Sequence, residues 1–441
     1  MLEKPLKLLS NNTMSTKLVN KTNGKLKGEI VIPADKSISH RAVMFSSVAK
    51  GISKIENFSQ GADCLSTLDV FKSLGVHAEF KDEKTLIINA KNGLFAPKKD
   101  LDCGNSGTTM RLMSGILAGQ NFNSILTGDE SLSKRPMGRV IKPLELMGAK
   151  IVSTQEHAPL KIFGQKLNGI DYISELASAQ VKSCVLLAGL HAKGKTSFTE
   201  PFLSRNHTEL MLEYLGAKIS HDKTVPTKII IEHSELTPKN ITVAGDISSA
   251  AFFIVAGLIV PNSEIILRNV GLNPTRTGIL DVAKNMGANI EILDKNIVSN
   301  ELVGDLKIKY CELKACTIEG DIIPRLIDEL PIIAVLATQA QGTTIIKNAQ
   351  DLRNKESDRI KAVVCELKKL GANIEETPDG FIIEGKTKLK GKVEVKTYHD
   401  HRLAMSLYVA GLICENQISI NGFEWVNISF PEFENLFENI L

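Results

Sequence analysis

The chain has 441 residues, too many for one ordinary hydrophobic core, so we expect two domains of roughly 200 residues each. Its hydrophobic content of 43% and charged content of 23% are typical of a soluble globular protein. The formal net charge of +3 is too small for a protein that binds nucleic acid or a membrane surface. An aromatic content of 5% argues against a base-stacking platform.

The seven cysteines lie far apart and include no Cys-x-x-Cys pair. This spacing argues against a disulfide scaffold and a zinc cluster, so we expect a reducing compartment, no metal and no cofactor. The apolar runs 250–260 and 331–337 are too short to span a membrane, and the polar N-terminal segment up to about Asn23 has no apolar signal core. We expect a cytoplasmic monomer with a frayed N-terminal extension, in which Met14 is an alternative start.

Two strands, at 17–19 and 29–32, are predicted before the first helix, which covers 37–49. A phrase then recurs along the chain: a helix-like stretch ends in Leu or Met, a glycine follows, and an alternating β-rich segment begins. These glycines are Gly75, Gly148, Gly216, Gly287 and Gly371. Each fits the position just after a helix, where a positive φ is needed. The period is too long for a solenoid, and it predicts a β/α module that is used several times.

The final helix, 431–441, has no strands after it, whereas the N-terminal strands have no helix before them. Joining the two ends completes a sixth unit. We therefore predict one domain from residues 1–33 plus 245–441 and a second from 34–244, with a hinge near 33–34 and 244–245. Duplicated units without any hinge are the alternative.

Arginines and lysines recur beside glycines, hydroxyl residues or carboxylates. They occur in the segments 36–41, 105–111, 134–139, 204–205, 353–359 and at Arg402. Guanidinium groups bind phosphate and carboxylate in a planar, two-pronged manner, so this pattern indicates a site for small, multiply anionic substrates.

Several of these residues have a plainer alternative. Lys36 opens a helix and offers an ammonium at a phosphate-binding N-terminus, while Ser37 is equally a helix cap. Asp328 precedes a buried apolar run, where a carboxylate needs a cation or a polar ligand. Lys355 and Arg359 have the spacing of one helix face, which on its own indicates an exposed, salt-bridged helix.

Other polar residues near these motifs are expected to be structural. Glu329 is predicted to be an exposed cap, His207 a structural histidine, Arg111 a brace for its loop and Arg139 a partner in ion pairs. His399 and His401 lack a third ligand, which argues against a metal site.

Seven motifs resemble the 5-enolpyruvylshikimate-3-phosphate synthase family (3-phosphoshikimate 1-carboxyvinyltransferases), in the branch called class II. They are 35–41, 104–111, 127–139, 178–180, 328–331, 353–359 and 400–402. The resemblance implies an α/β protein with the two-domain enolpyruvyl transferase fold, an inverse α/β barrel with three βαβαββ units in each domain. It implies transfer of the enolpyruvyl group of phosphoenolpyruvate to the 5-hydroxyl of shikimate 3-phosphate, with release of phosphate, on the shikimate pathway to chorismate and aromatic amino acids.

The resemblance also assigns residue roles. It makes Asp328, Glu356 and Lys36 catalytic. It places the following residues against shikimate 3-phosphate: Lys36, Ser37, Arg41, Ser178, Ala179, Gln180, Arg205, Asp328 and Lys355. It places a second set against phosphoenolpyruvate: Lys36, Gly107, Arg135, Gln180, Arg359 and Arg402. Glyphosate, which occupies the phosphoenolpyruvate site of this family, is the expected inhibitor.

Two rival functions remain at this point. The sister enzyme that uses UDP-N-acetylglucosamine usually carries a cysteine in the loop that corresponds to 129–134, where this chain has none. A non-catalytic anion-binding protein would have no use for Asp328 and Glu356. Because cations stand on both predicted halves, we expect them to repel one another until an anionic substrate draws the halves together.

Overall fold

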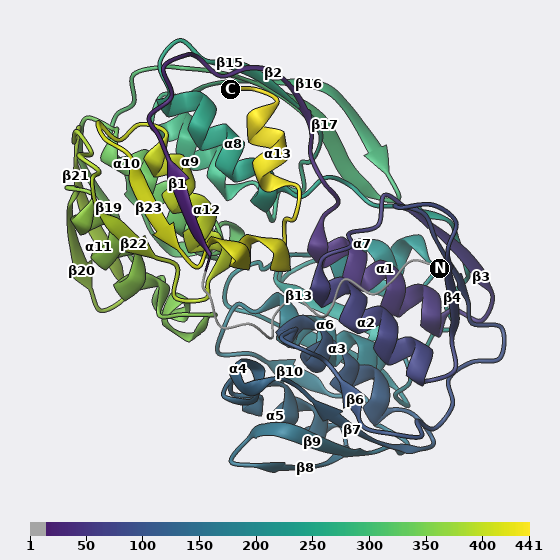
Figure 1. Cartoon of the computed structure of the whole chain (residues 1–441). Coiled ribbons are helices and arrows are strands. Elements are labelled where there is room, and N and C mark those ends of the chain that lie inside the picture. The colour runs from purple at the N-terminus through teal and green to yellow at the C-terminus, as the bar shows by residue number, and fades with distance from the viewer. Residues whose placement is uncertain (1–14) are drawn as a thin grey trace.

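The computed structural model describes residues 15–441, and it divides into two lobes (Figure 1). The lower lobe contains α1 (Lys36–Val48) to α7 (His207–Tyr214), whereas the upper lobe contains β1 (Thr16–Val19) and α13 (Phe433–Glu438). The expected alternative start at Met14 lies outside the described residues. The expectation of a frayed extension up to Asn23 is wrong for residues 16–19, because they form β1 and pair with a strand near the C-terminus.

The lower lobe holds three four-stranded sheets. The strands of the first sheet, in spatial order, are β14 (Ile241–Thr242), β3 (Ile52–Glu56), β5 (Leu86–Asn89) and β4 (His77–Phe80). Those of the second sheet are β6 (Leu101–Asp102), β7 (Asn123–Thr127), β9 (His157–Phe163) and β8 (Lys150–Thr154). Those of the third sheet are β10 (Asp171–Ile173), β11 (Lys195–Thr199), β13 (Lys228–Glu232) and β12 (Ile219–His221). In each sheet the first two strands are parallel and the other pairs are antiparallel.

The upper lobe repeats this arrangement. Its first sheet consists of β2 (Lys27–Val31), β15 (Glu264–Gly271), β17 (Glu301–Lys309) and β16 (Asn289–Val298). The second consists of β18 (Thr317–Ile318), β19 (Gly342–Ile346), β21 (Gly380–Gly385) and β20 (Asn373–Thr377). The third consists of β22 (Glu394–Lys396), β23 (Ile418–Asn421) and β1. One parallel pair is followed by two antiparallel pairs in the first two sheets and by a single antiparallel pair in the third. Six βαβαββ-like units therefore build the described chain, three in each lobe, and the α/β fold prediction is confirmed.

Helices fill the interior of each lobe. The lower lobe also contains α2 (Ala62–Ser73), α3 (Gly107–Ala118), α4 (Glu130–Ser133), α5 (Gly138–Leu146) and α6 (Ala179–Gly189). The upper lobe contains α8 (Ile247–Ile259), α9 (Gly278–Asn285), α10 (Leu330–Thr338), α11 (Arg359–Lys369) and α12 (His401–Gly411), with short 3₁₀ turns at Gly320–Arg325, Gln350–Asn354 and Phe423–Ile428.

The recurring glycines end helices as predicted. Gly75, Gly148, Gly216, Gly287 and Gly371 all have φ between +86° and +95°, directly after the helix C-caps. Only glycine adopts this conformation without steric cost, and the chain then turns into the next strand. The recurring glycine thus marks, in five units, the turn between a helix and the strand that follows it.

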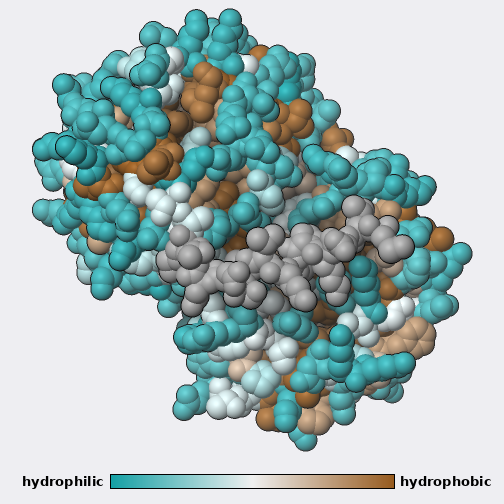
Figure 2. All heavy atoms as spheres, in the orientation of Figure 1, coloured by the Kyte–Doolittle hydropathy of each residue, from teal (hydrophilic) through white to brown (hydrophobic). Residues whose placement is uncertain are grey.

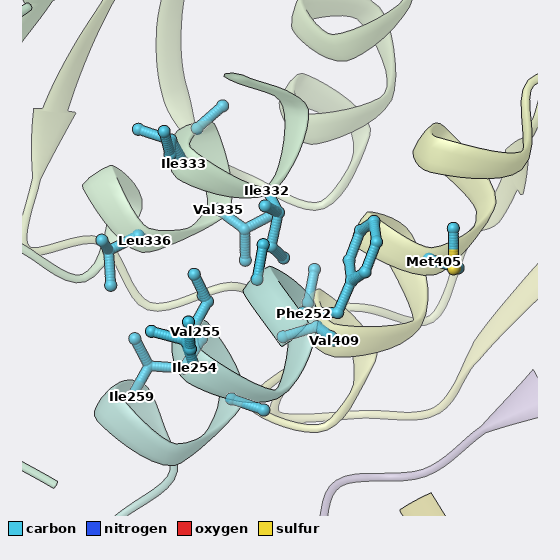
Figure 3. Packing of buried hydrophobic residues seen from close by; sticks show 14 of the residues in the cluster. Phe252, Ile254, Val255, Ile259, Ile332, Ile333, Val335, Leu336, Met405 and Val409 are labelled. Atoms are coloured by element: carbon cyan, nitrogen blue, oxygen red, sulfur yellow. The ribbon is translucent and has the colours of Figure 1, made fainter. Parts of the chain in front are cut away.

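Each lobe has its own hydrophobic core. Phe252, Ile332 and Val409 come from α8, α10 and α12, which pack against one another in the upper core (Figure 3). The lower core comes from residues 34–244, joined by Val303 of β17. On the face seen in Figure 2, hydrophilic residues cover most of the surface and hydrophobic residues form separate patches. None of the helices in residues 15–441 is long and apolar enough to cross a bilayer.

The chain passes between the lobes at two points that lie side by side. The Asp35 amide donates to the Ala244 carbonyl at 2.7 Å, and the Asp246 amide donates to the Pro33 carbonyl at 2.8 Å. Asp35 then caps α1 in the lower lobe, and Asp246 caps α8 in the upper lobe. The two hydrogen bonds between the crossing segments therefore position the N-caps of both α1 and α8.

Candidate active site

A cavity of about 650 Å³ lies between the two lobes. It is lined from the lower lobe by α1, α3, α6 and their preceding loops, and from the upper lobe by the segments before α10, α11 and α12. Every residue that the sequence predicts for the site lines this cavity: Lys36, Ser37, Arg41, Gly107, Arg135, Ser178, Ala179, Gln180, Arg205, Asp328, Lys355, Glu356, Arg359 and Arg402. Their individual roles remain predictions.

Five helices begin at the cavity wall. The first residues of α1, α3, α6, α11 and α12 all line it, and they are Lys36, Gly107, Ala179, Arg359 and His401. Free N–H groups and the positive end of the helix dipole at such positions attract anions. In the lower lobe, α3 and α6 pack so closely at Gly115 that a Cβ on this residue would lie 2.2 Å from the Cys184 carbonyl of α6. This close packing helps to bring the two helix N-termini together.

Lys36 stands at the start of α1 and forms an ion pair with Asp63, the second residue of α2. Burial opposes the charge of Lys36, but Asp63 outweighs it and raises the pKa of the lysine. The side chain is therefore an ammonium at neutral pH. Asp63 is a neighbour that the sequence analysis missed, because its contact with Lys36 depends on how α1 and α2 pack.

Arg41 lies one turn further along α1 and is buried. Its guanidinium donates to the Thr208 hydroxyl at 2.8 Å, the Ser183 hydroxyl at 2.8 Å and the Ser37 carbonyl at 3.0 Å. Burial lowers the pKa of Arg41 to about 10, which still leaves it charged at neutral pH. These contacts fix the orientation of the guanidinium at the cavity wall.

A second group of lower-lobe residues surrounds the N-terminus of α3. Arg135 donates to the Asn105 side chain at 2.9 Å, and Arg111 donates to the Gln180 side chain at 2.5 Å. A Cβ on Gly107 would lie 3.3 Å from an Arg111 nitrogen and 3.4 Å from an Arg135 nitrogen. Arg111 thus contacts Gln180 of α6, whereas it was predicted to brace its own loop, and Gly107 leaves space between two guanidinium groups.

Asp328 is the centre of the upper-lobe charges. Its carboxylate lies 2.5 Å from an Arg205 nitrogen, 3.2 Å from the Lys355 nitrogen and 3.3 Å from an Arg359 nitrogen. Burial disfavours the charged form, but Lys355 and Arg205 hold the pKa of Asp328 well below its ordinary value. The carboxylate is therefore ionised at neutral pH.

Glu356 is the second half-buried carboxylate at the cavity. It accepts from Arg359 at 2.6 Å and lies 3.7 Å from Arg135 across the cavity. Burial again opposes the charge, and Arg359 with its neighbours holds the pKa of Glu356 well below its ordinary value. Arg359 is itself fixed by Asp400, the N-cap of α12, at 2.7 Å. The imidazole of His401 is kept neutral, because burial and Lys36 lower its pKa to about 4.

Among residues 15–441, ion pairs across the cavity include Arg205 to Asp328, Arg135 to Glu356, and Arg139 to Asp351 at 3.4 Å. The expectation that opposing cations simply repel one another is therefore wrong for these residues. Asp328 and Glu356 place negative charge between the arginines and lysines of the two lobes, and attraction results.

The family model for EPSP synthase (3-phosphoshikimate 1-carboxyvinyltransferase) matches residues 20–437 of the chain. This chain belongs to the EPSP synthase family. The 3-phosphoshikimate 1-carboxyvinyltransferase of Bacillus subtilis (strain 168) is 54% identical over 412 residues, which cover 92% of this chain and 96% of that protein. That of Thermoanaerobacter sp. (strain X514) is 52% identical over 414 residues and covers 94% and 97%.

Solved structures agree with this membership of the EPSP synthase family. The EPSP synthase of Acinetobacter baumannii superposes with a TM-score of 0.86 at 42% identity, covering 96% of this chain and 98% of that one. The enolpyruvyl transferase NikO from Streptomyces tendae, with a TM-score of 0.78 at 16% identity, covers 97% and 98% and shares the fold.

Three local predictions for this EPSP synthase family member are wrong. Lys355 and Glu356 lie in a turn rather than on the helix face shared with Arg359, because α11 begins only after its cap, Asp358. Glu329 is buried rather than exposed, since its carboxylate accepts from the Ser248 hydroxyl. Ser37 does not cap α1, because the Asp35 side chain already accepts from the Ile38 amide at 2.8 Å.

Arg276 is a buried residue of the cavity wall that the sequence analysis missed. Its guanidinium lies 3.3 Å from Asp35 and 3.2 Å from Asp246, the caps of α1 and α8, and 3.2 Å from the His207 ring. His207 in turn lies 2.6 Å from Glu301, which confirms its structural place. The only sequence signal for Arg276 was a charged residue inside the turn-like run 273–278.

Proposed function

We propose that the cavity binds shikimate 3-phosphate and phosphoenolpyruvate side by side and that the residues assigned by motif carry out the reaction. As a member of the EPSP synthase family, the protein transfers the enolpyruvyl group to the 5-hydroxyl of shikimate 3-phosphate and releases phosphate. The observation that carries the proposal is the convergence of five helix N-termini and many cations on two half-buried carboxylates, Asp328 and Glu356.

The acceptor site is assigned to the lower lobe and to Lys355. The N-terminus of α6, at Ser178 and Ala179, and the guanidinium of Arg205 would hold the 3-phosphate, and Arg41 would hold the ring carboxylate. The remaining acceptor contacts are assigned to Lys36, Ser37, Gln180 and Asp328.

The phosphoenolpyruvate site is assigned to the cations that face each other around Gly107. Arg135 from the lower lobe and Arg359 and Arg402 from the upper lobe would bind its phosphate and carboxylate, while Lys36 and Gln180 contact both substrates. The fixed positions of Arg135, beside Asn105, and of Arg359, beside Asp400, preorganise these guanidinium groups for an anion.

Asp328 is the proposed acceptor for the 5-hydroxyl proton. Its low pKa makes it a weak base while Arg205 and Lys355 contact it. An incoming 3-phosphate would compete for both cations, and loss of their contacts would raise the pKa of Asp328. Binding of the acceptor would in this way activate the base that the reaction needs.

Glu356 and Lys36 are the proposed proton carriers at the enolpyruvyl methylene. The 5-hydroxyl oxygen forms a bond to C2 as C3 gains a proton, which gives a tetrahedral, phosphate-bearing intermediate. Loss of phosphate and of one C3 proton then restores the double bond. The ammonium of Lys36 can donate the proton that C3 gains in the first step. Glu356, held by Arg359, can accept the proton that C3 loses in the second step.

The function is tested by following phosphate release with each acceptor. We expect release to require both phosphoenolpyruvate and shikimate 3-phosphate, and we expect none when UDP-N-acetylglucosamine replaces the acceptor. Turnover with the nucleotide sugar, or phosphate release without any acceptor, would contradict the proposal.

We also propose that residues 1–33 with 245–441 and residues 34–244 form two domains that close on the substrates about the crossings near 33–34 and 244–245. The ion pair of Arg205 with Asp328 would be exchanged for contacts with the 3-phosphate as the cavity fills. We expect small-angle scattering to give a smaller radius of gyration with shikimate 3-phosphate present. An unchanged radius at saturating ligand would refute closure.

Glyphosate is expected to inhibit the enzyme at the phosphoenolpyruvate site. A methyl group at Gly107 would narrow the space between Arg111 and Arg135, because its carbon would lie 3.3 Å and 3.4 Å from their guanidinium nitrogens. We expect Gly107→Ala to raise the glyphosate inhibition constant more than the KM for phosphoenolpyruvate, by about 1–3 kcal/mol in binding. Gly24→Ala, where a Cβ meets nothing within 4 Å and the backbone is not in the left-handed region, is the control for added bulk. Equal rises in both constants would show that Gly107 does not discriminate.

The further proposals are that the enzyme is a monomer and that it resides in the cytoplasm. Light scattering on the purified protein and fractionation of cells that express it test these two points, and a stable dimer or a membrane-bound pool would contradict them.

A further inference from the structure

Beneath the cavity, Lys182 of α6 is fully buried between two carboxylates. Its nitrogen lies 2.8 Å from Glu200 and 2.8 Å from Glu209, and none of the three side chains is more than 3% exposed. Burial opposes the charge of Lys182, but Glu209 and Glu200 raise its pKa. An ammonium therefore stays ionised inside the lower lobe, outside the set of residues that line the cavity.

This cluster holds the loop that carries Arg205. The Ser204 amide donates to Glu200 at 2.8 Å, and the Lys182 ammonium donates to the Ser204 carbonyl at 3.2 Å. Both backbone polar groups of the residue before Arg205 are thus bound to the same buried ion pair. On the other side of Arg205, α7 begins at His207 and carries Glu209. The loop has little freedom to move independently of Lys182.

Lys182 is also fixed to the start of α6. Its amide donates to the Ser178 carbonyl at 3.0 Å, so it lies one turn after the α6 N-terminus. One residue therefore connects two elements that reach the cavity: the N-terminus of α6 at Ser178 and Ala179, and the loop with Arg205.

A buried ion cluster is a poor means of stabilising a fold. Desolvation of the charges offsets most of their attraction, and well-packed apolar side chains of similar volume are often as stabilising. What this cluster provides is a fixed geometry: Lys182 contacts Glu200, Glu209 and the Ser204 carbonyl, and Glu200 also accepts from the Ser204 amide. This argues that Lys182 determines where Arg205 stands rather than how stable the lobe is.

We propose that Lys182 is a positioning residue for the acceptor phosphate, which sets the separation between Arg205 and the N-terminus of α6. The inference rests on the proposed function, in which these two elements bind the 3-phosphate. It gives the Lys182, Glu200 and Glu209 cluster a role in affinity for the phosphate of the acceptor, and none in binding phosphoenolpyruvate.

The test is the variant Lys182→Met/Glu200→Gln/Glu209→Gln, which removes all three charges and leaves no unpaired ion. We expect the KM for shikimate 3-phosphate to rise by about tenfold to hundredfold, the scale for losing one oriented, charge-assisted contact. The KM for phosphoenolpyruvate and kcat at saturating acceptor should stay within about threefold of the unmodified enzyme. Lys195→Met, which removes an exposed lysine paired with Glu232 on the same lobe, is the matched control and should change neither constant.

Shikimate without its phosphate separates this role from a general loosening of the lobe. As a competitor of the acceptor, shikimate should have the same inhibition constant with the variant and the unmodified enzyme, because Arg205 has no phosphate to bind. Equal losses for shikimate and shikimate 3-phosphate, or parallel rises in both KM values, would overturn the proposal.

If the triple variant does not fold, Glu200→Gln replaces it. This change keeps an acceptor for the Ser204 amide but weakens the hold on Lys182. A rise of about threefold or more in the KM for shikimate 3-phosphate alone is expected, and no rise would overturn the proposal. If the unmodified enzyme itself fails to bind shikimate 3-phosphate, the proposed function fails, which is a different outcome from any of these.

Discussion

Replacing Lys36 with methionine should lower kcat/KM for phosphoenolpyruvate by about a thousandfold, the combined scale of a lost proton carrier and a lost anion contact. Lys36 is the first residue of α1 and has a raised pKa, because Asp63 outweighs the effect of burial. It therefore supplies a positive charge where a helix N-terminus already attracts anions. Methionine is one heavy atom shorter than lysine; it keeps an unbranched apolar side chain and removes the charge together with the N–H donors of the ammonium.

The pH dependence of this group has a definite sign. A raised pKa means that Lys36 stays charged up to a pH above the ordinary range of lysine and loses its proton only beyond it. Any alkaline decline of activity near neutral pH must therefore come from another group. The matched control is Lys50→Met, near the other end of α1, where an exposed lysine pairs with Glu235. A Lys36→Met enzyme within about tenfold of normal kcat/KM would exclude Lys36 from the chemistry.

Asp328→Asn should lower kcat by about 100-fold or more and leave the affinity for shikimate 3-phosphate within about tenfold. Asparagine has the shape of aspartate and can still accept from Arg205 and Lys355, but it cannot take a proton from the 5-hydroxyl. Removing the negative charge also frees both cations for the 3-phosphate, so binding need not weaken. Steady-state turnover measures the first effect, and titration with the acceptor measures the second.

Asp321→Asn is the control for this change, because Asp321 is an exposed carboxylate in the 3₁₀ turn before Asp328. It should behave as the unmodified enzyme. Near-normal turnover of Asp328→Asn would remove Asp328 as the proton acceptor. A large loss of acceptor affinity with normal kcat would instead make it a binding residue.

The sequence predicts the framework of the fold well because the signals for it are local. The glycines after five helices mark the repeated unit, and alternating segments mark its strands. Many residues around the cavity were also predictable, since most of the predicted ones lie in short motifs near the start of a helix, whereas Asp63 and Arg276 were missed. The resemblance to a known family was needed to join those motifs into one site.

Contacts between distant segments were not predictable from the sequence in this way. The burial of Glu329 depends on the Ser248 hydroxyl, which lies in another helix and also accepts from Arg276 at 2.6 Å. The turn at Lys355 and Glu356 was missed although Asp358, a common cap residue, stands just before the next apolar stretch. The spacing of Lys355 and Arg359 predicts one helix through both residues, but the Asp358 cap makes α11 begin only at Arg359.

The paired crossings between the lobes bear on how the gene can be rearranged. Pro33 and Asp246 are already hydrogen-bonded, as are Asp35 and Ala244, so the proposed domain of residues 34–244 would be a cassette whose two ends meet. Removing this segment would divide none of the described sheets, because β14 pairs with β3 inside the segment and β2 pairs with β15 outside it. The cassette is nevertheless not self-sufficient: its first carboxylate, Asp35, is neutralised by Arg276 of the host segment. A transplanted cassette would need a host that supplies the same guanidinium.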